Sequence, residues 1–173
     1  MPAIDRVALL ELLAAVTHTR VDVAPIASVI ELATHDPWGY VRQHAESLRA
    51  YGVAEPVASL PALALFGHVP AAHLMYVDWK ASMDDVLDGM VAILAAGPGL
   101  AFDATPWRAK VAAWDRRPRI EAALKEIPIS GGVLIAVDTG GDSHAIACMP
   151  AAAAKRISTW KRKTGLPIKR LTR

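Results

Sequence analysis

The chain has 173 residues with a formal net charge of +2, and 53% of its residues are hydrophobic. This length suits one domain with a real core, and we expect residues 1–173 to form a single domain. No apolar run approaches the roughly 18 residues that a membrane-spanning helix needs, and the first residues lack the pattern of a signal peptide. We therefore predict a cytoplasmic protein without membrane association. Its single cysteine, Cys148, excludes an internal disulfide.

The charges are distributed unevenly along the chain. Residues 1–150 carry 11 Lys and Arg against 17 Asp and Glu, a balance of −6, whereas residues 151–173 carry eight basic residues and no acid. An acidic body and a basic tail can pair with each other, or they can present two faces to different partners.

The first 67 residues are predicted to form a helical layer. Helices are expected over residues 4–16, 23–34, 38–50 and 55–66, and Asp36 before Pro37 is a typical start for the third of them. The buried face of the first helix is expected to hold the apolar residues that recur at helical spacing: Val7, Leu10, Leu13 and Ala14.

Residues 68–173 are predicted to form an α+β core with a basic C-terminal tail. The apolar and aromatic run at residues 73–79 suits a strand, and Ser82 with Asp85 is a capping-box start for a helix over residues 83–96. The face of this helix is expected to hold Val86, Met90, Ile93 and Leu94. Two further helices are expected over residues 105–114 and 119–127.

A β-hairpin is predicted near the end of the chain. The apolar runs Val133–Val137 and Ala145–Met149 are too short for buried helices, and the seven residues between them are rich in turn formers. A helix over residues 151–163 and a short edge strand over residues 166–171 follow.

The elements after residue 73 therefore have the order β-α-β-β-α-β. We interpret this order as a split βαβ arrangement, a ferredoxin-like sheet with its helices on one face. We further expect the first and third strands to be parallel neighbours, which would place Asp78 and Ser143 at opposite ends of the sheet.

Two short strings in the hairpin turn resemble catalytic motifs. The string from Val137 to Gly140 matches the hydrophobic-Asp-Thr-Gly string of aspartic proteases, whose chemistry needs two such aspartates. Only one copy is present. Gly141-Asp142-Ser143 resembles the Gly-Asp-Ser block of a hydrolase family, but the Asp-x-x-His that should follow is missing. We therefore predict no catalytic residue of either class.

An enzymatic alternative remains open for the same turn. A hydrolase or a metal-assisted enzyme would use Asp138, Asp142, Ser143 and His144 as its reactive groups. The acidic residues suit turn and capping positions equally well, and the six histidines have no spacing typical of zinc ligands. We predict no metal site and no cofactor, and we interpret Cys148 as a buried small hydrophobic residue.

The basic tail supplies a second alternative, a nucleic-acid-binding accessory protein. Lys and Arg residues around Trp160 could contact a polyanion, with the indole ring stacking on a base. In the simpler interpretation, Ile157 and Trp160 pack inward and the basic side chains form a solvated helix face.

Two blocks of the sequence resemble an uncharacterised bacterial domain family. The first is Asp78-Trp79-Lys80 followed by the acidic helix start at Met83–Leu87, and the second is the hairpin turn from Val137 to His144. More distantly, the glycine-rich acidic turn is similar to the SUKH superfamily, many of whose members neutralise toxins. That resemblance implies binding rather than catalysis.

We therefore predict a non-enzymatic protein-binding module, and more specifically an immunity protein that neutralises a bacterial toxin. Its acidic body suits a basic partner, because complementary charge speeds association. The residues that we expect to contact this protein partner are Asp78, Lys80, Asp84, Asp138, Asp142 and Ser143.

Overall fold

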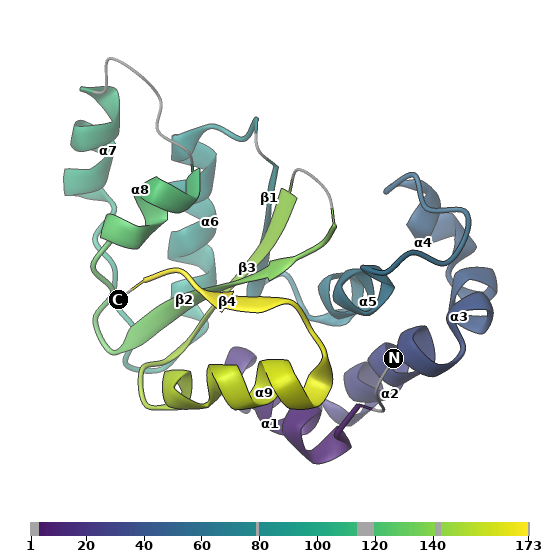
Figure 1. Ribbon diagram of the computed structural model, residues 1–173. Coiled ribbons are helices and arrows are strands. Elements are labelled where there is room, and N and C mark those ends of the chain that lie inside the picture. The colour runs from purple at the N-terminus through teal and green to yellow at the C-terminus, as the bar shows by residue number, and fades with distance from the viewer. Residues whose placement is uncertain (1–3, 79, 114–119, 141–142, 173) are drawn as a thin grey trace.

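A computed structural model describes residues 4–78, 80–113, 120–140 and 143–172. A four-stranded sheet lies between two groups of helices (Figure 1). The strands are β1 (Leu74–Asp78), β2 (Gly132–Asp138), β3 (Ser143–Pro150) and β4 (Ile168–Arg170). The helices are α1 (Arg6–Val16), α2 (Ala24–His35), α3 (Pro37–Gln43), α4 (Ala45–Arg49), α5 (Leu60–His68), α6 (Met83–Ala95), α7 (Thr105–Ala112), α8 (Ile120–Glu126), the 3₁₀ helix η1 (Ala153–Arg156) and α9 (Ile157–Thr164). The predicted α+β class, the leading helices and the β-α-β-β-α-β order are confirmed.

The strand order is β1-β3-β2-β4, and every neighbouring pair is antiparallel. The expectation that the first and third strands are parallel is therefore wrong, although they are neighbours. Their register pairs Asp78 directly with Ser143. These two residues lie at the same end of the sheet, and this pairing creates the site described below.

Helices cover both faces of the sheet, so the expected one-sided arrangement is wrong. The side chains of α1, α2, α5 and α9 pack on one face, and those of α6, α7 and α8 pack on the other. The chain crosses from β1 to β2, and later from β3 to β4, and both crossovers move along the sheet toward the β4 edge. The starting strands, β1 and β3, run antiparallel to each other. Two crossovers of the same hand therefore place their helices on opposite faces of the sheet.

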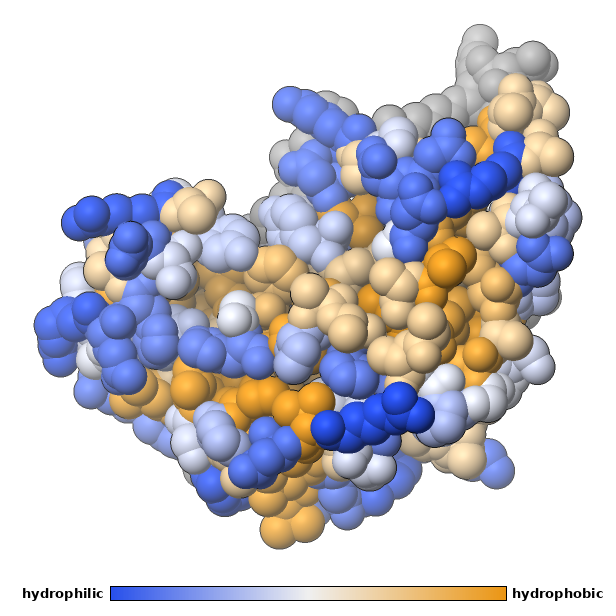
Figure 2. Space-filling model, turned by 180° about the vertical axis from the view of Figure 1, so that it is seen from behind, coloured by the Kyte–Doolittle hydropathy of each residue, from blue (hydrophilic) through white to orange (hydrophobic). Residues whose placement is uncertain are grey.

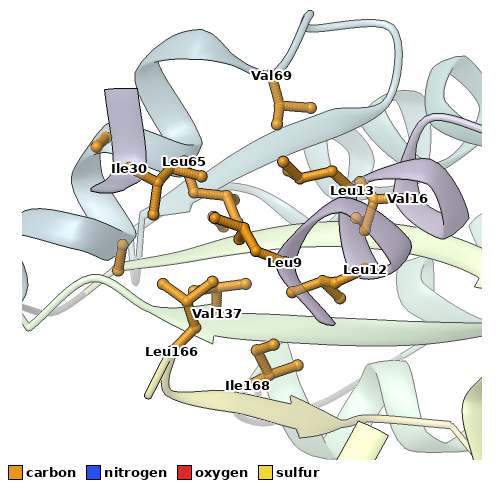
Figure 3. Close-up of a cluster of buried hydrophobic side chains, with 14 of the residues drawn as sticks. Leu9, Leu12, Leu13, Val16, Ile30, Leu65, Val69, Val137, Leu166 and Ile168 are labelled. Carbon is orange, nitrogen blue, oxygen red and sulfur yellow. The ribbon is translucent and has the colours of Figure 1, made fainter. Parts of the chain in front are cut away.

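The two central strands are buried on both faces, which explains why they are continuous apolar runs. Figure 3 shows one side of this core, where side chains of α1 such as Leu9, Leu12 and Leu13 meet Val137 of β2 and Ile168 near the chain end. Cys148 on β3 belongs to the opposite core and is 1% exposed. Burial raises the pKa of its thiol to about 12, as suits a small hydrophobic residue.

Local start signals in the sequence are confirmed. The side chain of Asp36 accepts a hydrogen bond from the backbone N–H of Gly39 (2.8 Å) at the start of α3. Ser82 and Asp85 form the predicted capping box of α6, and the four apolar residues predicted for its face are buried.

Several predicted boundaries are wrong. The expected helix over residues 38–50 is divided at His44 into α3 and α4, and α5 starts at Leu60 rather than near residue 55. The predicted helix over residues 105–114 ends at Ala112, and Trp114 lies outside the described residues.

The buried face of α1 is also displaced from the predicted one. Val7 is 67% exposed, and the buried residues are Ala8, Leu9, Leu12, Leu13 and Val16.

Among the described residues, no helix combines the length and apolar character needed to cross a bilayer.

Candidate functional site

The tip of the β2–β3 hairpin packs against the start of α5. Gly140 has φ +81°, and a Cβ atom at this position would lie 2.7 Å from Cβ and Oγ of Ser59. The backbone N–H of Gly140 donates to Asp138 Oδ1 (2.9 Å), which fixes the turn. Both the positive φ and the close approach require glycine here, and together they hold the hairpin tip beside the helical layer.

A cleft of about 480 Å³ lies between this hairpin tip and the helices. We call it the hairpin cleft. Its helical side is formed by Ala50, Tyr51, Val53, Val57, Ser59 and Leu63, and its sheet side by Tyr76, Asp78, Thr139, Gly140 and Ser143. Seen from behind, the molecule is notched between the lobe of α3–α5 and the body that holds the sheet (Figure 2). The volume lies within the range typical of ligand sites.

Three hydroxyl groups form a hydrogen-bonded chain on the sheet side of the cleft. Thr139 Oγ1 donates to the carbonyl O of Ser143 (2.9 Å) and lies 3.3 Å from Ser143 Oγ. Because a hydroxyl has one proton, Ser143 must donate in this second contact. Ser143 Oγ then accepts from Tyr76 Oη at 2.5 Å. The chain therefore uses all three hydroxyl protons.

Two of the side chains that line the hairpin cleft, Tyr51 and Tyr76, are aromatic. Phe66 of α5 contacts both Tyr51 and Tyr76, with ring centroids 5.8 and 5.0 Å apart, and the two tyrosine rings are 6.4 Å apart. Tyr51 and Tyr76 are 41% and 42% exposed. Burial, and to a smaller extent Tyr76, raises the pKa of Tyr51, so its phenol is neutral near pH 7.

Two of the six predicted contact residues line this cleft. Asp78 follows Tyr76 by two positions in β1, so both side chains lie on the same face of the strand. The antiparallel register then places Ser143 opposite Asp78. Asp78 Oδ1 accepts a hydrogen bond from the backbone N–H of Lys80 (2.7 Å).

The other predicted contact residues lie elsewhere. Asp138 has a turn role and pairs in register with His144, not with Ser143. Asp84 of α6 pairs with Arg108 of α7, with 3.1 Å between Asp84 Oδ1 and a guanidinium nitrogen. This pair belongs to the helices on the face of the sheet opposite to the cleft. Neither Asp84 nor Lys80 lines the hairpin cleft, and Asp142 lies outside the described residues.

The residues of the enzymatic alternative are divided between the two faces of the sheet. Ser143 faces the hairpin cleft, whereas the next residue, His144, has its Nε2 atom 2.7 Å from Glu121 Oε1 of α8. Glu121 also binds Lys169, and this contact is the main cause of its lowered pKa. Ser143 and His144 therefore do not form a pair. The described residues contain no group of three or more His, Cys, Asp and Glu side chains arranged to hold a metal ion.

The basic tail is folded onto the acidic body. Trp160 is 2% exposed and its indole N–H donates to Glu11 of α1 (3.3 Å), which confirms the predicted inward packing. Arg156 also binds Glu11. Lys163 binds Asp5 (2.8 Å), the N-cap residue of α1. Two basic side chains of the tail thus neutralise two acids of the N-terminal helix and its cap.

Sequence reasoning missed the aromatic part of the cleft. Tyr76 could have been found, because it is the outward residue of the alternating strand Leu74–Asp78. Tyr51 and Val57 carry no such signal, since they lie in the irregular segment between α4 and α5. The sequence predicts a break between two helices at Tyr51 and the first turn of a helix at Val57.

Comparison with known proteins identifies one related family. A family model with the description Domain of unknown function (DUF6630) matches residues 7–172. No curated protein and no solved structure matches the chain.

Proposed function

We propose that this chain, which belongs to the DUF6630 family, is a protein-binding module whose contact surface is the hairpin cleft. One observation carries this proposal. The described residues include six exposed large hydrophobic side chains, and three of them, Tyr51, Val57 and Tyr76, line this one cleft. Gathered exposed apolar side chains are typical of interaction sites, and tyrosine is enriched among the residues that dominate binding energy.

The polar groups of the cleft favour binding over catalysis. A nucleophilic hydroxyl needs an adjacent base, but the hydroxyl of Ser143 is held by those of Tyr76 and Thr139. His144 is directed to the other face of the sheet, where Glu121 holds it. The described lining of the cleft contains one carboxylate and no histidine or cysteine.

The partner that we infer is a bacterial toxin, and the chain would then act in the cytoplasm as an immunity protein. Residues 1–150 carry six more acidic than basic residues. The basic tail pairs with Asp5, Glu11 and Glu121, so the attraction of a basic toxin would come from the acids that the tail does not pair, which include Asp78 of the cleft, because complementary charge raises the rate of encounter. The similarity of the glycine-rich hairpin turn to SUKH proteins supports the same role.

The direct test uses the proteins encoded next to this gene. Each neighbouring product is purified, and its binding to this chain is measured by calorimetry. Growth is then followed in cells that express the neighbour with and without this chain. We expect one neighbour to be toxic alone, to bind this chain and to be neutralised by it. If no neighbour binds, the immunity role is wrong.

Matched variants test the contact surface. Tyr51→Ala and Tyr76→Ala remove exposed aromatic side chains from the cleft, and we expect each to weaken binding at least about thirtyfold, as for hot-spot residues. Trp38→Ala and Val91→Ala remove exposed apolar side chains of α3 and α6, neither of which lines the cleft. These controls should bind normally. Equal losses in both groups would contradict the cleft as the contact surface.

A further inference from the structure

We infer that the hairpin cleft receives a cationic side chain of the protein partner, an arginine. This inference rests on the proposed function, because it names the group that the binding surface recognises. Three independent features of the cleft support it: the direction of its hydroxyl protons, its carboxylate and its exposed aromatic rings.

The hydroxyl groups of the cleft present acceptors rather than donors. Thr139 donates its hydroxyl proton to the carbonyl O of Ser143, Ser143 donates its own to Thr139 Oγ1, and Tyr76 donates its own to Ser143 Oγ. Each hydroxyl oxygen has two lone pairs, so Tyr76 Oη retains both of its acceptor sites. A ligand that donates hydrogen bonds fits this surface, and an anionic ligand such as a phosphate would find no donor among these hydroxyls.

Asp78 gives the cleft a negative charge. Its Oδ1 atom accepts the backbone N–H of Lys80, and a carboxylate has a second oxygen and further lone pairs for another donor. Hydrogen bonds between a carboxylate and a cationic donor are about twice as strong as neutral ones. Asp78 and Tyr76 lie on the same face of β1, so one ligand group can reach both of them.

The aromatic rings favour a cation, and a guanidinium group in particular. A cation within about 6 Å of a ring centroid is attracted by the ring, and arginine is found in such contacts more often than lysine. Tyr51 and Tyr76 both line the cleft and are each about two-fifths exposed. A guanidinium group is planar, carries five donors and is weakly hydrated. It can therefore stack on a tyrosine and donate to Asp78 and Tyr76 Oη together.

A defined peptide pair tests this inference. Acetyl-Gly-Arg-Gly-amide and the same peptide with citrulline, the neutral isostere of arginine, are titrated into the ¹⁵N-labelled chain. We expect saturable shifts of the amide signals of Gly140 and Asp78 with the arginine peptide, and binding of the citrulline peptide that is about tenfold weaker or more. Equal responses to the two peptides, or no saturable shift with arginine, would overturn the inference.

Variants separate charge and ring contributions. Asp78→Asn keeps one acceptor oxygen for the Lys80 N–H but removes the charge and replaces the other carboxylate oxygen with an NH₂ donor, and it should weaken arginine binding about tenfold. Tyr51→Phe keeps the ring and should bind normally, whereas Tyr51→Leu should bind more weakly. Asp88→Asn, an exposed carboxylate of α6 outside the cleft, is the charge control. An equal loss in Asp78→Asn and Asp88→Asn would contradict a specific role for Asp78.

Failure of this inference can be distinguished from failure of the proposed function. If the partner protein needs Tyr51 and Tyr76 but tolerates Asp78→Asn, and the arginine peptide does not bind, the binding surface stands and the arginine inference is wrong. If the arginine peptide binds in the cleft but no partner protein does, the recognition chemistry stands and the proposed function is wrong.

Discussion

The hydroxyl groups of Tyr76 and Ser143 lie 2.5 Å apart, although 67 positions separate the two residues in sequence. They are diagonal neighbours, because Tyr76 pairs with Ala145 and Asp78 pairs with Ser143 in the β1–β3 register. A long side chain can reach such a neighbour. Ser143 is 7% exposed, so this contact ties a buried hydroxyl of the hairpin to an exposed tyrosine of the edge strand.

This hydrogen bond should contribute measurably to stability. We expect Tyr76→Phe and Ser143→Ala each to lower the free energy of unfolding by about 0.5–1.5 kcal/mol. Because both remove the same contact, the double variant should be less destabilised than the sum of the two, with a coupling energy of about 1 kcal/mol. Urea unfolding of the four proteins measures this coupling, and strictly additive effects would contradict it.

Gly140→Ala should be more destabilising than Gly165→Ala. Both glycines have positive φ, +81° and +70°, so alanine is strained at either position by about 1–2 kcal/mol. At Gly165 an added Cβ meets nothing within 4 Å, whereas at Gly140 it would lie 2.7 Å from Ser59. The difference between the two variants therefore measures the contact between the hairpin tip and the helical layer. Each 1 kcal/mol lost from the free energy of unfolding should lower the Tm by about 2–4 °C for a chain of this size.

If thermal unfolding gives equal losses for the two glycine variants, the hairpin tip is not held against Ser59. The hairpin cleft would then lack a fixed wall. A selective loss at Gly140 supports the observed wall, and ligand binding to the cleft should weaken with it.

The fold could be predicted where the deciding signals are local. The Ser82–Asp85 capping box and the Asp36 N-cap depend on residues three positions apart, and the hairpin depends on two apolar runs around a turn. The pairing of β1 with β3 and the covering of both sheet faces depend on long-range packing. No pattern within a single segment specifies them.

For the same reason, only some residues of the candidate site could be predicted from the sequence. Asp78 and Ser143 could be named from their motifs, but their convergence depends on an antiparallel register that brings distant segments together. Tyr51 and Val57 come from the irregular segment between α4 and α5, which has no periodicity to indicate an exposed wall. The acidic residues Asp84 and Asp138 were selected by their charge alone. Asp84 pairs with Arg108 and Asp138 accepts a hydrogen bond within the turn, and neither lines the cleft.

Two variants test which face of α1 is buried. The alanine- and leucine-rich sequence of this helix fits helical spacing in more than one phase, and packing against the sheet selects the one with Leu9 at 0% and Val7 at 67% exposure. We expect Leu9→Ala to lower the free energy of unfolding by about 2–5 kcal/mol through loss of burial and cavity formation. Val7→Ala should change it by less than about 0.5 kcal/mol. Urea unfolding checks both, and a larger loss for Val7→Ala would contradict the observed face.

Folding stability should fall on mild acidification because of three histidines. Burial is the main cause of the lowered pKa of His18, His68 and His73, and neighbouring His73, His44 and Arg20 lower these values further. Their unfolded pKa is about 6.5, so the unfolded chain binds more protons below that pH. The contribution of these three neutral histidines to folding stability is therefore fully present above about pH 6.5. It is lost as the pH falls from there through the lower pKa values of the folded state.

The pair of His18 and His73 offers the sharpest test of this pH dependence. Their rings lie 5.9 Å apart, and both residues are buried at 8% and 6% exposure. His18→Asn removes a titrating group, and asparagine tolerates the positive φ of +54° at this position. We expect urea unfolding of the variant to show a smaller loss of stability than the parent between about pH 7 and pH 5, above the range in which the carboxylates titrate. An unchanged loss in the variant would show that protonation of His18 does not oppose folding.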